Sequence, residues 1–213
     1  MTRIKSYCLR VGALAALAAA TQVTSFAGEA DSGGIKFRFP VGLTYANGAS
    51  DVMHALEDSF KDNGYSVSDT FVWPVGLSLN PRVEFPCGAS VGVAIGPAEF
   101  LVVKKNTGYS ENTDFNCIVP VGGYLQYNIL RDKKFSPFAR AGVRYPFTVG
   151  DYLKSSTVGA FVAGGVEIFR MKKIGFGIEA GYDWSQVSVS AGSIGGNRDV
   201  KPIGFNVSIF ALF

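Results

Sequence analysis

The residue types that could support catalysis are sparse in this chain. A histidine beside a serine or an acidic residue can act as a general base, but His54 is the single histidine and no serine lies at a fixed strand spacing from it. Cys87 and Cys117 are too far apart in the sequence for zinc-ligand spacing. The glycines precede no helix in the pattern of a nucleotide-binding loop. We therefore predict no catalytic, cofactor-binding or metal site, and interpret His54 as a solvated loop residue.

Charged residues with a regular spacing are the better candidates for function. They occur in segments where apolar residues alternate with glycine, serine or charged residues, on the face opposite the apolar one. The seven residues of this face are Lys36, Arg38, Arg140, Arg144, Glu167, Glu179 and Asp183. Charges enclosed in a narrow interior must pair, because unpaired buried charge is strongly unfavourable. Two interpretations stay open, a salt-bridged plug and a gate that lines a narrow path for small solutes.

Eight segments with a period of two must position these charges. They cover residues 35–45, 67–79, 89–96, 115–129, 139–148, 159–168, 174–184 and 203–213. One face of each is rich in Val, Ile, Leu and aromatic residues, and the other in Gly and Ser. Residues 50–63 break the pattern and predict a short helix in the first long connection. Ser50 would cap this helix, and Val52, Leu56 and Phe60 would share one face.

The faces and the connections favour a membrane barrel over a soluble one. A soluble lipocalin-like barrel, which stays open as an alternative, would bury its apolar faces, whereas here the other face is polar. Large aromatics gather near both ends of the segments, as in the girdles of membrane barrels. The long connections are residues 46–65, 104–114, 149–157 and 188–200, and they alternate with short ones such as 131–134 and 170–173. We predict an all-β fold, a closed antiparallel up-and-down transmembrane β-barrel of about eight strands.

The N-terminus has the features of a secretory signal peptide. Arg3, Lys5 and Arg10 precede an apolar run over residues 11–20, and Ser25-Phe26-Ala27 provides small residues for cleavage. We predict a signal peptide over residues 1–27, a short periplasmic segment over 28–34 and the barrel domain over 35–213. Removal of residues 1–27 leaves 17 basic and 17 acidic residues, from the 20 and 17 of the whole chain. Such a neutral chain has no electrostatic footprint for nucleic acid.

The C-terminal segment carries a family resemblance. Phe205, Val207, Ile209 and Phe213 place apolar residues at alternating positions before a terminal aromatic. This segment resembles the closing strand of the small eight-stranded, porin-like outer-membrane barrels of Gram-negative bacteria, of the OmpA, OmpX and OmpW types. The resemblance implies that these residues form a signal for the barrel assembly machinery. It also implies outer-membrane lipid and lipopolysaccharide as partners, with small polar solutes as further ones.

Four prolines and two cysteines leave further alternatives open. Pro40, Pro74, Pro120 and Pro146 lie inside predicted strands with their side chains inward, and Pro120 faces Pro146 if the hairpin centres on Lys133. They could mark bulges in a tight barrel or a pinched level that holds a ligand. Cys87 and Cys117 would meet an oxidising compartment, but the topology places them near opposite ends of neighbouring strands, which leaves a disulfide open.

The leading functional hypothesis is a non-enzymatic outer-membrane protein with a structural or surface-interaction role and small-solute passage as the close alternative. A lipid A-modifying enzyme and a soluble periplasmic binding barrel are the alternatives from other classes. The predicted helix would be a lid or adhesive element, or would simply pack over the barrel mouth.

Overall fold

The computed structural model describes residues 34–106, 111–170, 172–190 and 197–213. The predicted signal peptide, and residues 28–33 of the predicted periplasmic segment, lie outside the described residues. The elements are β1 (Lys36–Arg38), β2 (Pro40–Ala46), α2 (Gly48–Asp62), β3 (Ser66–Val72), β4 (Val75–Leu79), β5 (Arg82–Glu84), β6 (Ala89–Ile95), β7 (Glu99–Asn106), β8 (Glu111–Asn128), β9 (Phe135–Val149), β10 (Leu153–Thr157), β11 (Gly159–Ile168), β12 (Gly175–Asp183), β13 (Gln186–Val189), β14 (Arg198–Val200) and β15 (Gly204–Leu212).

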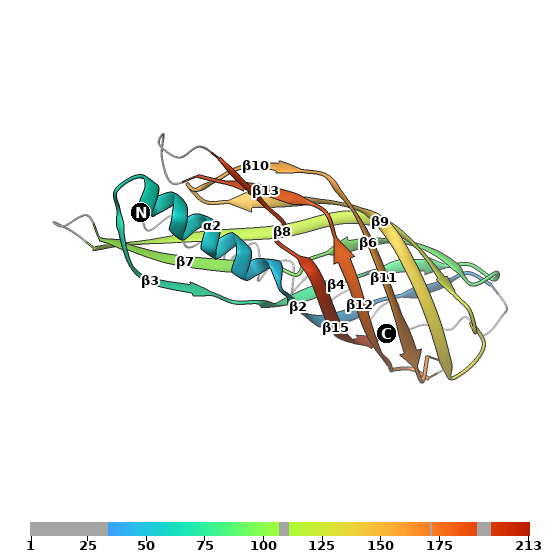
Figure 1. Cartoon of the computed structure of the whole chain (residues 1–213). Coiled ribbons are helices and arrows are strands. Elements are labelled where there is room, and N and C mark those ends of the chain that lie inside the picture. The colour runs from blue at the N-terminus through green and yellow to red at the C-terminus, as the bar shows by residue number, and fades with distance from the viewer. Residues whose placement is uncertain (1–33, 107–110, 171, 191–196) are drawn as a thin grey trace.

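Eight strands close into an antiparallel ring (Figure 1). The order around it is β2, β4, β6, β8, β9, β11, β12 and β15, and β15 pairs again with β2. At the end of the barrel with the short turns, β5 continues β4 and pairs with both β1 and β6. The predicted closed eight-stranded barrel is therefore confirmed.

Apolar side chains point out of this ring and polar side chains point into it. On β15, Phe205 and Ile209 are exposed, whereas Asn206 and Ser208 are buried. The ten aromatics predicted for the two girdles are all exposed, namely Tyr45, Trp73, Phe115, Tyr145 and Trp184 towards one end and Phe37, Phe85, Tyr127, Phe176 and Phe213 towards the other. This distribution is the reverse of that in a soluble barrel, so the apolar band needs an apolar solvent.

The register of the longest hairpin confirms the predicted proline pair. Pro120 on β8 is the Cα partner of Pro146 on β9, which centres the hairpin on Lys133. Pro40, Pro120 and Pro146 are buried, in agreement with an inward orientation.

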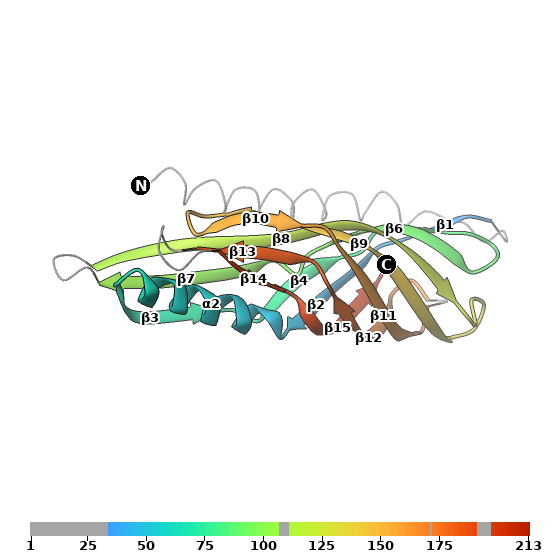
Figure 2. The ribbon, with the colours of Figure 1, turned by 45° about the horizontal axis from the view of Figure 1, so that its top comes forward.

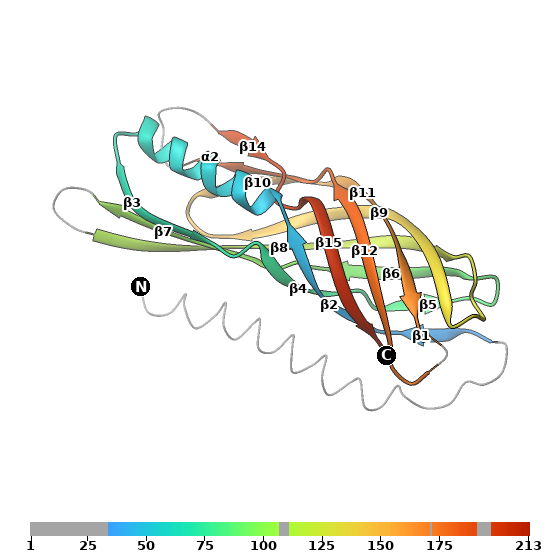
Figure 3. The same ribbon diagram turned by 60° about the horizontal axis from the view of Figure 1, so that its bottom comes forward.

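At the other end the chain continues past the ring. We call this part the cap; it consists of α2, β3, β7, the outer parts of β8 and β9, and the β10–β13–β14 sheet. A strand needs roughly 9–11 residues to cross a membrane, whereas β8 has 18 and β9 has 15. Their outer parts join β3, β7, α2 and the three-stranded sheet β10–β13–β14 (Figures 2 and 3). Residues 149–157 and 188–200, which were predicted as long connections, thus contribute strands to the cap.

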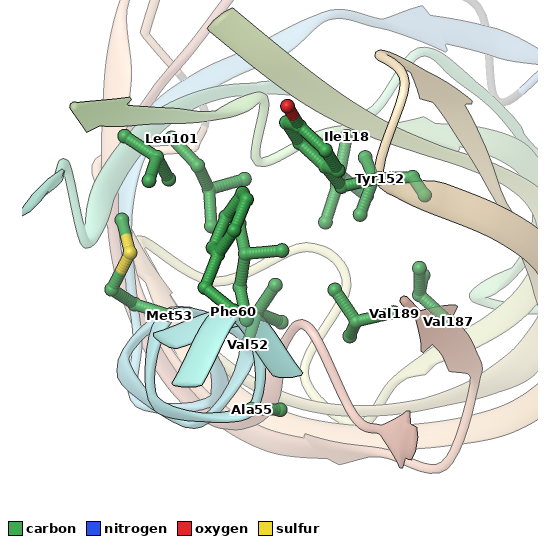
Figure 4. Packing of buried hydrophobic residues seen from close by; sticks show 12 residues of the cluster. Val52, Met53, Ala55, Phe60, Leu101, Ile118, Tyr152, Val187 and Val189 are labelled. Carbon is green, nitrogen blue, oxygen red and sulfur yellow. The ribbon is translucent and has the colours of Figure 1, made fainter. Parts of the chain in front are cut away.

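The cap has an apolar core of the kind found in soluble proteins (Figure 4). Val52, Leu56 and Phe60 on α2 are fully buried, which confirms the predicted helix face. They pack with residues from β7, β8 and the β10–β13–β14 sheet, including Leu101, Ile118, Leu153, Val187 and Val189. Helix α2 therefore packs against the other elements of the cap. Among the described residues, no helix is both long and apolar enough to cross a membrane.

The start of α2 differs from the prediction. The helix begins at Gly48 with Asn47 at the N-cap position, not at Ser50, and the Asn47 side chain makes no capping hydrogen bond. Instead, the backbone N–H of Gly48 donates to the carbonyl oxygen of Ile203 at 3.1 Å. A Cβ at position 48 would lie 2.0 Å from the carbonyl oxygen of Lys201, so close backbone packing fixes the helix start.

Cys87 and Cys117 are not joined to each other. Cys87 lies exposed in the turn between β5 and β6, and Cys117 is buried in β8.

Candidate functional site

The predicted lumen-facing charges differ in how deeply the structure buries them. Five of the seven are buried: Arg140, Arg144, Glu167, Glu179 and Asp183. Lys36 and Arg38, at the end with the short turns, are half-buried. The inward assignment was made from alternation alone. The charges form several levels along the barrel axis.

The middle and outer levels each contain one ion pair between β9 and β12. Arg140 pairs with Glu179, and Arg144 Nη1 lies 3.1 Å from Asp183 Oδ2. Both arginines also lie over aromatic rings, Arg140 at 5.1 Å from the Tyr124 ring centroid and Arg144 at 4.1 Å from that of Phe161. The two levels thus contain paired charges and aromatic rings from the neighbouring strands β8, β9, β11 and β12.

The level nearest the short turns is more complex. We call Arg38, Arg82, Glu84, Arg131, Glu167 and Arg170 the basal cluster. Arg82 pairs with Glu167, while Arg170 pairs with both Glu84 and Glu167. The carboxylate of Glu167 also accepts hydrogen bonds from Gln126 Nε2 at 3.2 Å and Asn128 Nδ2 at 3.1 Å. Residues from four strands, β1, β5, β8 and β11, and from two turns thus meet in one network.

Four members of the basal cluster were missed by the sequence reading. Arg82 and Glu84 continue the inward parity of Ser78 but were assigned to a turn. Extending the alternation of the preceding strand would have identified both residues as inward-facing. Arg131 and Arg170 lie in short turns. Arg170 points inward because Phe169, with a φ of 58°, reverses the direction of the chain, and no periodicity reveals this.

Glu99 is a further buried charge that the sequence reading left unassigned. It begins β7, is 1% exposed, and has both carboxylate oxygens without a hydrogen-bond partner. Gly96, with a φ of 86°, ends the predicted strand, and the buried positions are even-numbered before it (Ser90, Ala94) and odd-numbered after it (Glu99, Leu101). Two residues further along β7, Leu101 packs in the cap core. Glu99 thus lies at the boundary between the lumen and the cap core.

The geometry around His54 does not assemble a catalytic set. Its side chain is 76% exposed on α2, and its Nδ1 lies 4.0 Å from Glu57 Oε2. Within the described ranges, no group of three or more His, Cys, Asp or Glu residues is placed to hold a metal ion.

The C-terminal residues close the ring. Phe205, Ile209 and Phe213 are exposed on the outer face of the barrel, and Val207 is half-buried. β15 pairs with β12 on one side and with β2 on the other, so the last strand joins the first.

A closed antiparallel ring of eight strands with an apolar exterior and an ion-paired interior defines the architecture of small outer-membrane β-barrels. A search of solved structures supports this class. The chain is similar to the outer membrane protein OprG from Pseudomonas aeruginosa, with a TM-score of 0.50 and 14% identity over 84% of this chain and 94% of that one. It also matches Neisserial surface protein A (NspA), with a TM-score of 0.37 and 13% identity over 86% of this chain and 97% of that one. At these identities the likeness to OprG shows the fold alone. No family model and no curated protein matches the chain.

Proposed function

We propose that this protein is a non-enzymatic outer-membrane barrel with a structural or surface-interaction role. The observation that carries the proposal is the apolar outer band, bounded by aromatic girdles, around a ring whose interior is filled by paired charges. Such a surface is stable only in lipid, and such an interior closes the lumen instead of opening it.

The orientation follows from the connections. The turns at the basal end are short, and the opposite end carries the cap. In bacterial barrels the short turns face the periplasm and the longer connections face outward. The cap is therefore the part of the molecule presented at the cell surface, where lipopolysaccharide surrounds it. The exposed C-terminal residues Phe205, Ile209 and Phe213 are the proposed contact for the barrel assembly machinery.

Passage of small polar solutes is the second candidate. It is favoured by the polar side chains at every level of the lumen, because the pairs Arg140–Glu179 and Arg144–Asp183 would separate to open a path. A lipid A-modifying activity would have to use His54 as its base, and this side chain is 76% exposed on α2. His54→Ala should leave the mass spectrum of lipid A unchanged. Loss of a lipid A modification in this variant would support the enzymatic alternative.

The membrane assignment is tested by fractionation and gel mobility. The folded protein should be recovered from the outer-membrane fraction only with detergent. Unheated samples should migrate differently from boiled ones, because a closed barrel resists detergent denaturation. Recovery of folded protein in the detergent-free periplasmic extract would contradict the proposal and favour a soluble binding barrel.

A further inference from the structure

One carboxylate in the basal cluster is surrounded by three guanidinium groups. Glu84 Oε1 lies 3.0 Å from Arg131 Nε, and Glu84 Oε2 lies 3.7 Å from Arg38 Nε. Arg170 Nη2 also donates to Glu84 Oε2. The Glu84 side chain is completely buried, so its single negative charge must serve three positive groups.

The rest of the basal cluster does not restore the balance. Glu167 pairs with Arg82 and Arg170, which gives four arginines against two glutamates in the described cluster. The Nε atoms of Arg38 and Arg82 are buried and have no hydrogen-bond acceptor. Excess positive charge in a narrow interior is costly unless an anion compensates it. The cluster therefore has both the charge and the unused donors for an anionic ligand.

Access to this cluster lies at the end with the short turns. The side chains of Arg38 and Arg131 are 13% and 11% exposed, whereas those of Arg82 and Arg170 are 1% or less. Arg131 Nη1 donates to the carbonyl oxygen of Pro86, and Arg131 Nη2 donates to that of Gly34. Both Nη atoms of Arg131 are therefore already engaged by the backbone at the entrance. Arg38 is the other accessible arginine, and its one ion pair among the described residues is the 3.7 Å contact with Glu84.

Exposed lysines lie at the same end of the barrel. The turn between β8 and β9 carries Lys133 and Lys134, and the turn between β11 and β12 carries Lys172 and Lys173. The two turns lie side by side, because the backbone N–H of Phe169 donates to the carbonyl oxygen of Lys134. Four lysines against the one carboxylate of Asp132 in the described residues of these two turns favour the approach of anions.

We infer that the basal cluster binds a phosphate group at Arg38, entered from the end with the short turns. Guanidinium groups match the geometry of phosphate oxygens, which accept two parallel hydrogen bonds. The phosphate belongs either to a free inorganic ion or to the headgroup of a phospholipid. The inference concerns binding and does not depend on solute passage through the lumen.

Equilibrium dialysis of the detergent-solubilised, folded protein against radiolabelled inorganic phosphate at low ionic strength tests this site. We expect saturable binding of one phosphate per chain. Arg38→Gln should weaken it at least tenfold, and should still fold because Glu84 keeps Arg131 and Arg170. The matched control is Lys154→Gln, which removes an exposed positive charge on β10 at the opposite end and should bind as the wild type does.

The heat-dependent gel shift verifies folding of each variant before dialysis. No saturable phosphate binding by the folded wild type, or equal binding by the folded Arg38→Gln variant, would overturn the inference. The source of the phosphate group is distinguished by competition. If vesicles containing phosphatidylglycerol displace phosphate and phosphatidylcholine vesicles do not, the ligand is a lipid headgroup. If neither displaces it, the ligand is a free oxyanion.

Discussion

The barrel and the cap are packed by opposite chemistry within one chain. In the barrel, charged and polar side chains such as Arg140 and Glu179 are buried, while residues such as Leu43 and Ile209 are exposed. In the cap, Leu56 and Phe60 are fully buried, while Arg198 forms its ion pairs at the surface. The change occurs along single strands, since β8 contributes Gln126 to the lumen network and Ile118 to the cap core. The proposed orientation explains the difference, with lipid around the barrel and water around the cap.

The largest expected effect comes from breaking the basal cluster. Glu84→Gln removes the carboxylate shared by Arg38, Arg131 and Arg170 and leaves Glu167 as the one remaining carboxylate of the basal cluster. We expect the free energy of unfolding to fall by about 3–5 kcal/mol, the usual cost of an uncompensated buried charge. Urea unfolding in lipid vesicles measures it, with the exposed turn residue Asp132→Asn as the control. Equal stability of the two variants would mean that the cluster contributes little to folding.

A cavity in the cap core should have the next largest effect, and a local one. Leu56→Ala removes a fully buried side chain from α2 and should destabilise the cap by about 3 kcal/mol. Hydrogen exchange should accelerate in α2 and in the β10–β13–β14 sheet, while the heat-dependent gel shift of the barrel stays unchanged. Leu77→Ala, at an exposed position on β4, is the matched control and should leave exchange in the cap as it is. Simultaneous loss of the gel shift in Leu56→Ala would show that the two regions fold as one unit.

The smallest effect is expected at the surface of the cap. Arg198 Nη1 and Nη2 lie 2.9 Å and 2.8 Å from carboxylate oxygens of Asp58 and Asp62. Because these groups are solvated, Arg198→Ala should change the thermal midpoint only slightly, and the difference should vanish in high salt. A large decrease in the thermal midpoint that persists in high salt would contradict the proposal that water surrounds the cap.

Alternation was enough to predict the barrel because each side chain's face follows from its position in a strand. Arg140 and Glu179 were therefore predicted to share the lumen, and they form an ion pair. The pattern could not predict Arg170 or Glu99, since the positive φ angles of Phe169 and Gly96 change the parity just before them.

The cap was beyond the reach of local patterns for a different reason. Its core joins α2 to β13, more than a hundred positions later in the chain, so no window of sequence contains both. The helix face Val52, Leu56 and Phe60 was visible in the sequence, but its packing partners were not. Short strands such as β10 and β14, with three to five residues, are stabilised by these distant contacts.

Single-channel recording in a planar bilayer tests the central claim, that ion pairs close the lumen of a membrane-inserted barrel. Wild-type protein that is verified as inserted and folded should show no discrete openings, because the pairs Arg140–Glu179 and Arg144–Asp183 fill the lumen between the basal cluster and the cap. Discrete wild-type openings whose conductance changes in Arg140→Ala or Glu179→Ala would contradict that claim and establish a gated path for small solutes.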